Sequence, residues 1–131
     1  MRKHKQGLIA LILVMTLVNF FAQAQTVKKL DPQNFENKLQ SVNNPLLVDV
    51  RTQGEYNQGH LSNAILIDYN SSEFKSRLSK LDKTKAVFVY CAVGGRSNAA
   101  VNVLTGMGFK EIYDLQGGIS AWQQAKKPIS K

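Results

Sequence analysis

The chain of 131 residues is predicted to adopt an α/β fold, with a parallel sheet covered by helices on both faces. Short apolar runs recur along the chain, for example at 46–50 and 86–90. Segments with apolar residues at helical spacing separate these runs. Strands that alternate with helices form parallel sheets, and their strands are apolar throughout because both faces are buried.

The first 24 residues are expected to be a cleaved signal peptide. A basic start at 2–5 precedes an almost wholly apolar run at 7–18, and residues 22–24 supply the small-x-small pattern of a cleavage site. An uncleaved anchor is the alternative, but the apolar run is shorter than the roughly 20 residues that a spanning helix needs. We therefore expect export to the periplasm, with no membrane association after cleavage.

The first elements after Gln25 are set by capping and helix-breaking residues. A short edge strand is expected at 27–30. Asp31 suits the N-cap of a helix and Pro32 its first position, so a helix is expected from there to about residue 42. Asn43-Asn44-Pro45 ends that helix. A buried strand at 46–50 and a helical turn at 53–58 follow.

The remaining elements continue the alternation, with glycines where helices end. The expected order is a strand at 64–67, a helix capped by Ser71 or Ser72 and reaching about Leu81, the central strand at 87–90, a helix at 97–107 ended by Gly106 and Gly108, a strand at 111–115, and a short helix containing Trp122.

Composition limits the classes of partner and cofactor. The formal charge is +8, but the lysines are scattered rather than gathered with aromatic residues, so a solvated surface is favoured over nucleic-acid binding. A mild positive field still attracts small anionic substrates. One cysteine and two histidines are too few for a usual metal site or an internal disulfide. We expect no metal, no cofactor and a monomer.

The segment from Ala86 to Ser97 carries the chemistry. A strand ends in Cys91, the only cysteine, and a turn with two glycines leads to Arg96 and a helix. The amides of the turn and the helix N-terminus can converge on an anionic sulfur. A nearby helix N-terminus and a cation also lower the pKa of a thiol. A small buried cysteine beside a simple turn is the alternative. The residues expected to bind substrate are Ala92, Val93, Gly94, Gly95, Arg96 and Ser97, with Cys91 and Arg96 catalytic.

Four blocks in this order resemble a single-domain rhodanese. They are Leu47-Val48-Asp49-Val50-Arg51, the stretch from Glu55 to Ala64, the stretch from Cys91 to Ser97, and the stretch from Asp114 to Trp122. The resemblance implies one rhodanese-like domain at 25–131, with its core at about 40–128 and a five-stranded, mainly parallel sheet. It also implies a sulfurtransferase, in which Cys91 takes a sulfane sulfur from a donor such as thiosulfate. A persulfide then passes the sulfur to cyanide or a thiol.

Two other functions remain open. Phosphatases and arsenate reductases related to this family place five residues between the cysteine and the arginine, whereas four separate Cys91 from Arg96 here. A non-catalytic module that binds a partner is the third class, although such modules often lack the cysteine. Many members of the family that use thiosulfate have a basic residue after the cysteine, and Ala92 stands there in this chain.

Four residues are expected to support the site. Asp49 and Arg51 follow a strand at the edge where α/β sites form, and they can pair with each other and with Glu55. A structural ion pair is favoured for them over a direct chemical role. His60 stands in a Gly-His-Leu turn, so a hydrogen-bonded scaffold role is favoured over that of a general base.

Overall fold

The computed structural model describes residues 24–131. Except for Ala24, the predicted signal peptide lies outside the described residues. Among the helices of 24–131, none is both long and apolar enough to cross a membrane.

Five strands form one sheet in the order β1-β5-β4-β2-β3, and every neighbouring pair is parallel. This confirms the predicted α/β class and the five-stranded sheet. The central strand is β4, as expected, and all of its residues are buried. The strands are β1 (Thr26–Leu30), β2 (Leu46–Asp49), β3 (Ile65–Leu66), β4 (Val87–Tyr90) and β5 (Glu111–Leu115).

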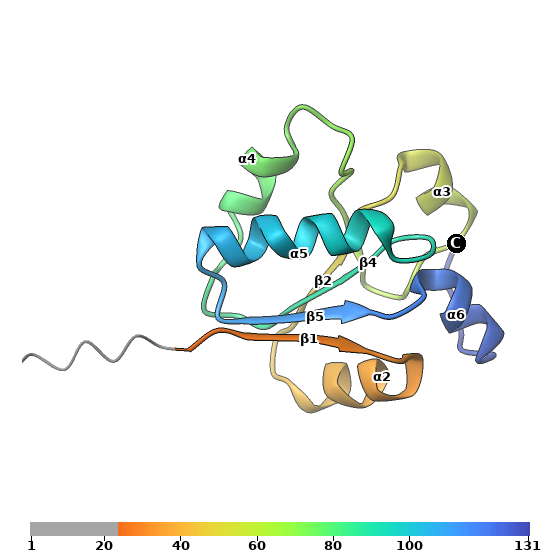
Figure 1. The fold of residues 1–131 in the computed structure, drawn as a ribbon. Helices are drawn as coiled ribbons and strands as arrows, with labels where there is room; N and C mark the ends of the chain where they lie inside the picture. The colour runs from red at the N-terminus through yellow and green to blue at the C-terminus, as the bar shows by residue number, and fades with distance from the viewer. Residues whose placement is uncertain (1–23) are drawn as a thin grey trace, which may run out of the picture.

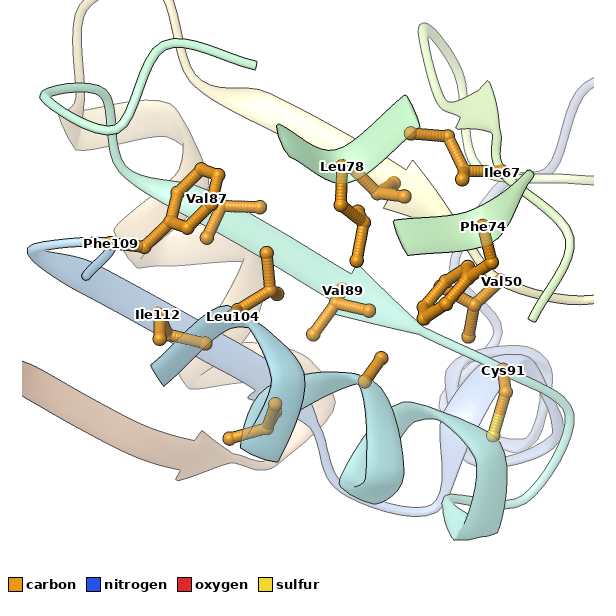
Figure 2. Close-up of a cluster of buried hydrophobic side chains, with 13 residues drawn as sticks. Val50, Ile67, Phe74, Leu78, Val87, Val89, Cys91, Leu104, Phe109 and Ile112 are labelled. Carbon is orange, nitrogen blue, oxygen red and sulfur yellow. The ribbon is translucent and has the colours of Figure 1, made fainter. Parts of the chain in front are cut away.

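Helices cover both faces of the sheet (Figure 1). On one face, α4 (Phe74–Ser79) and α5 (Gly95–Met107) pack over an apolar cluster that includes Val89 and Cys91 (Figure 2). On the other face, α2 (Pro32–Ser41) and α6 (Gly118–Gln124) enclose a second cluster built around Phe35, Phe88 and Trp122. The short helix α3 (Gln53–Gln58) follows β2 at the carboxyl edge of the sheet.

Three elements differ most from the sequence prediction. Strand β3 has only two residues, and Ile65 is 42% exposed, because this strand is at the edge and pairs with β2 alone. Helix α4 begins at Phe74, and its N-cap Glu73 makes no side-chain cap. Ser71 instead accepts the Glu73 N–H at 3.1 Å, so the predicted serine cap is wrong. Helix α5 begins two residues before Ser97, at Gly95, within the predicted turn.

Candidate functional site

Cys91 directly follows the central strand, and its sulfur points toward the start of α5 (Figure 2). The thiol is almost completely covered, with 1% of the residue exposed. Residues 91–96, named here the cysteine loop, turn from β4 into α5. The sulfur therefore lies where a central strand and a helix N-terminus meet.

Polar groups of the cysteine loop and of the first turn of α5 lie close to the sulfur. The Gly94 N–H donates to Cys91 Sγ at 3.1 Å, and the Ser97 hydroxyl oxygen lies 3.6 Å from the sulfur. Gly94 has φ +120°, a left-handed backbone conformation that favours glycine. Burial alone raises the pKa of the Cys91 thiol, but the Ser97 hydroxyl and the N–H groups of Ser97, Gly94 and Val93 reverse this. The net effect is a pKa below the ordinary value, which favours the thiolate.

The start of α6 fixes the orientation of the cysteine loop. The Ile119 N–H donates to the Cys91 carbonyl at 2.9 Å, and the Ser120 N–H donates to the Ala92 carbonyl at 3.1 Å. A trans peptide places its N–H opposite its carbonyl, so the N–H groups of Ala92 and Val93 face away from α6. The two hydrogen bonds from α6 therefore orient the N–H groups of Ala92 and Val93 toward the inside of the cysteine loop.

Gly118 allows this close approach. Its φ is +61°, and a Cβ atom there would lie 2.5 Å from both backbone atoms of the Ala92 carbonyl and from the Cys91 carbonyl oxygen. We expect Gly118→Ala to lower the free energy of unfolding by about 1–3 kcal/mol, through overpacking and strain. It should also reduce the reactivity of the Cys91 thiol. Thermal unfolding and alkylation rates measure the two effects.

Gly54→Ala is the matched control for this substitution. Gly54 lies within α3, and a Cβ atom added there would meet nothing within 4 Å. We expect this variant to be more stable by about 0.5–1 kcal/mol, since alanine is the better helix former. Equal stability losses in both variants would contradict the contact argument.

Arg96 pairs with a carboxylate. Its guanidinium donates to both oxygens of Glu55, at 2.7 and 2.9 Å. This contact with Arg96 is the main reason that the pKa of Glu55 falls to about 2. The direct partner of Glu55 is thus Arg96 rather than Arg51, because Glu55 reaches from α3 to the cysteine loop. Thr52 and Glu55 also form a capping box that fixes the start of α3.

Asp49 and Arg51 form a buried ion pair, as expected. Arg51 Nη2 lies 2.7 Å from Asp49 Oδ2, with the Asp49 and Arg51 side chains 0% and 6% exposed. The Tyr90 hydroxyl donates to the same Asp49 oxygen at 2.7 Å and accepts the Leu61 N–H at 3.0 Å. Arg51 also donates to the Gly59 carbonyl at 2.7 Å. This network joins the ends of β2 and β4 to the following turn.

His60 lies in the turn after α3, and its ring contacts the helix. Its Nδ1 lies 3.0 Å from the Tyr56 carbonyl oxygen, and its ring stacks on the Tyr56 ring with centroids 3.8 Å apart. Its backbone pairs with Ser130 near the end of the chain. These contacts fit a scaffold role for His60, which stays a prediction.

Sequence reasoning missed three contributors to this region. Tyr90 holds Asp49, the start of α6 holds the cysteine loop, and Asp114 is a buried carboxyl group on β5. An acidic residue within an otherwise apolar strand was the available signal for Asp114. Within 24–131, no group of three or more His, Cys, Asp or Glu side chains could hold a metal ion.

Comparisons with known proteins agree with this fold. The family model described as "Rhodanese-like domain" matches residues 31–125. A solved structure of a rhodanese-related protein from Thermoplasma volcanium superposes with a TM-score of 0.70, at 29% identity over 79% of this chain and 97% of that one. The two folds are therefore the same over almost the whole of that protein.

The curated relatives carry two kinds of name. A tRNA uridine(34) hydroxylase from Chlamydia abortus is 35% identical over 94% of this chain, which spans only 37% of that protein. A sulfurtransferase from Allochromatium vinosum is 32% identical over 79% of this chain and 94% of its own length. The thiosulfate sulfurtransferase GlpE from Coxiella burnetii is 36% identical over 65% of this chain and 77% of its own length.

Proposed function

The chain belongs to the rhodanese-like domain family, and from this premise we propose that it is a sulfurtransferase whose Cys91 carries a sulfane sulfur as a persulfide. The sulfurtransferase relatives support a rhodanese-type function, because they match this chain over most of their own length. The tRNA hydroxylases are much longer than this chain, so their activity is a weaker guide.

The observation that carries the proposal is the environment of Cys91. A buried thiol whose pKa is lowered by amide and hydroxyl donors is a ready nucleophile. The same donors would also stabilise a persulfide, in which the negative charge lies on the outer sulfur atom. A thiol buried only for packing has no need of these donors.

Two displacements complete the proposed cycle with thiosulfate. The Cys91 thiolate attacks the outer sulfur, a new S–S bond forms, and sulfite leaves with the electron pair of the broken S–S bond. Cyanide then attacks the terminal sulfur of the persulfide through carbon. Thiocyanate leaves, and the electron pair returns to Cys91 as a thiolate. No further oxidant or reductant is needed, and ping-pong kinetics follow.

The four-residue spacing favours sulfur over phosphate. Four residues, Ala92 to Gly95, separate Cys91 from Arg96, and the last of them already begins α5. A shorter loop encloses a single sulfur atom more closely than a tetrahedral phosphoryl group. Hydrolysis of a phosphate ester that depended on Cys91 would favour the phosphatase alternative.

Intact mass after incubation with thiosulfate tests the function. We expect a gain of one sulfur atom on the protein, which is lost when cyanide is added. Protein alkylated at Cys91 beforehand is the control and should gain nothing. The absence of the gain in unmodified protein, or its persistence after alkylation, would contradict the persulfide.

Arg96 gives a prediction about donor binding. Its fork-shaped guanidinium suits oxyanions, and in this structure the Glu55 carboxylate occupies that fork. We expect Arg96→Ala to raise the KM for thiosulfate about tenfold with a smaller change in kcat, which corresponds to the loss of one charged hydrogen bond. Steady-state kinetics at constant ionic strength measure the split. Arg96→Lys, which keeps the charge without the fork, should recover part of the loss. A lower kcat with unchanged KM would contradict a binding role.

A further inference from the structure

A cavity of about 260 Å³ lies between α3 and α6. The two helices lie at the same end of the sheet, and the last residues of the chain pass between them (Figure 1). Glu55 lines the cavity and pairs with Arg96 of the cysteine loop. Ile119 also lines it, and its N–H donates to the Cys91 carbonyl. The walls are mainly polar, so the cavity offers room and hydrogen-bonding groups to one small polar molecule.

Arg51 lines this cavity with a guanidinium that is only partly paired. The side chain is 6% exposed. Its Nε and Nη2 donate to Asp49, and Nη2 also donates to the Gly59 carbonyl. Nη1 donates to no other residue of the described part of the chain, and it is not fully buried. A guanidinium has five N–H donors, so the two on Nη1 are free to bind a group in the cavity.

Glu55 supplies a carboxylate to the same cavity. Its Oε1 accepts from Arg96 Nη1 at 2.7 Å and from the Thr52 hydroxyl at 3.1 Å. Within residues 24–131, Oε2 accepts from Arg96 Nη2 alone, at 2.9 Å, and a carboxylate oxygen can accept a second hydrogen bond. The contact with Arg96 lowers the pKa of Glu55 to about 2, so the group is negatively charged at neutral pH. Glu55 Oε2 can therefore accept from a cationic donor.

The charges around the cavity favour a dipolar ligand over a simple anion. Arg51 is paired with Asp49, and Glu55 is paired with Arg96, so the charges of the four groups cancel. Burial opposes the charge on Arg51, but Asp49 and, more weakly, Glu55 raise the pKa of the guanidinium, which stays a cation. An anion would be attracted by Arg51 and repelled by Glu55. A zwitterion complements both groups.

Two glutamines and two isoleucines complete the lining. Gln58 ends α3 and Gln123 lies in the last turn of α6, and both residues are exposed. A side-chain amide can donate to a carboxylate and can also accept from an ammonium group. Ile119 and Ile129 supply the apolar part of the lining, which suits an aliphatic side chain.

We propose that this cavity binds a free aliphatic α-amino acid, whose carboxylate accepts from Arg51 Nη1 and Gln123 and whose ammonium group donates to Glu55 Oε2. The cavity borders the cysteine loop, but Cys91 makes no contact with the ligand. The inference therefore goes beyond sulfur transfer and does not depend on it.

Titration of isotope-labelled protein with L-valine, followed by two-dimensional NMR, tests the site. We expect saturable shifts with a Kd of about 1 mM, as a ligand of this size allows, and the largest shifts at the backbone amides of 58–60 and 119–123. N-acetyl-L-valine lacks the ammonium group and L-valinamide lacks the carboxylate, so each should bind about tenfold more weakly. Absence of saturable binding, shifts centred elsewhere, or equal binding of either derivative would overturn the proposal.

Gln123→Glu and Gln124→Glu form a matched pair of variants. The two residues are neighbours on α6 and both are exposed, but of the two only Gln123 lines the cavity. A carboxylate at position 123 would repel the carboxylate of the ligand. Gln123→Glu should therefore weaken L-valine binding about tenfold, whereas Gln124→Glu should leave the Kd unchanged. Equal weakening in both variants would show a general effect of charge and would overturn the assigned site.

Glu55→Gln tests the contact with the ammonium group. Glutamine at this position can keep the capping box of α3. We expect the variant to lose the preference for L-valine over N-acetyl-L-valine, and a preference that persists would overturn the place given to the ammonium group. None of these measurements uses a sulfur donor, so each remains decisive if thiosulfate transfer fails.

Discussion

Cys91→Ser is expected to reduce sulfur transfer from thiosulfate to cyanide to the uncatalysed background. Removal of the nucleophile from a covalent enzyme can cost roughly a millionfold in kcat. Serine keeps the size and the hydrogen-bond partners of this position, but its hydroxyl does not ionise near neutral pH and cannot carry a persulfide. Thiocyanate formation, followed over time, measures the loss.

The fold should survive this substitution. A serine hydroxyl at position 91 can accept the Gly94 N–H and contact the Ser97 hydroxyl, as the sulfur does. Circular dichroism and thermal unfolding should therefore resemble those of the wild-type protein. Gly106→Ala, on the same α5 helix and with open space at its Cβ position, is a matched control that should retain full transfer. Undiminished thiocyanate formation by the serine variant would exclude the persulfide mechanism.

Elements that are set by local chemistry could be predicted from the sequence. Asp31 caps α2 by accepting the Asn34 N–H at 2.8 Å, as its position before Pro32 indicated. Strands β4 and β5 have the predicted bounds, because apolar runs between turn residues leave few alternatives. The alternation of strands and helices then predicts a parallel sheet, which the structure has.

Elements that depend on tertiary contacts could not be placed in the same way. The apolar run at 64–67 predicts four strand residues, but β3 has only β2 as a neighbour and ends after Leu66. Ser71 and Ser72 are good caps in isolation, yet Ser71 serves the turn before α4. Capping preference does not say which of two adjacent turns a serine will serve.

The site also has parts that the local sequence predicts and parts that depend on tertiary contacts. The cysteine loop could be predicted because the strand, the glycines and the helix follow one another directly in the sequence. The partner of Arg96 could not be predicted, since Glu55 lies 41 positions earlier in the chain. The sequence places Tyr90 within a strand, and only the folded sheet shows that its hydroxyl donates to Asp49. The signal peptide and the assigned roles of the site residues stay predictions.

The largest expected loss of stability comes from the buried ion pair beneath the site. We expect Arg51→Ala to lower the free energy of unfolding by about 3–5 kcal/mol, because it leaves the Asp49 carboxylate buried without its cation. The variant also loses the hydrogen bond from Arg51 to the Gly59 carbonyl. Urea unfolding, with the wild-type protein in parallel, measures the difference.

A more exposed ion pair supplies the matched control. Glu36 lies 3.3 Å from Lys127, and the Glu36 side chain is 25% exposed. Glu36→Gln should cost at most about 1 kcal/mol, since solvent-accessible pairs contribute little. A similar loss in Arg51→Ala and Glu36→Gln would contradict the argument from burial.

The same network explains why Arg51→Ala should also weaken the chemistry at Cys91. Asp49 accepts from both Arg51 and Tyr90, and Tyr90 is the residue before Cys91. Without Arg51, the carboxylate has to draw in water or a proton, and either change moves the end of β4. Asp49→Leu combined with Arg51→Met replaces the pair with apolar groups of similar volume, and it should recover part of the stability, because the Tyr90 hydroxyl and the Gly59 carbonyl still lose their partners. Recovery of stability without recovery of thiol reactivity would show that the ion pair holds the cysteine loop in place as well as stabilising the sheet.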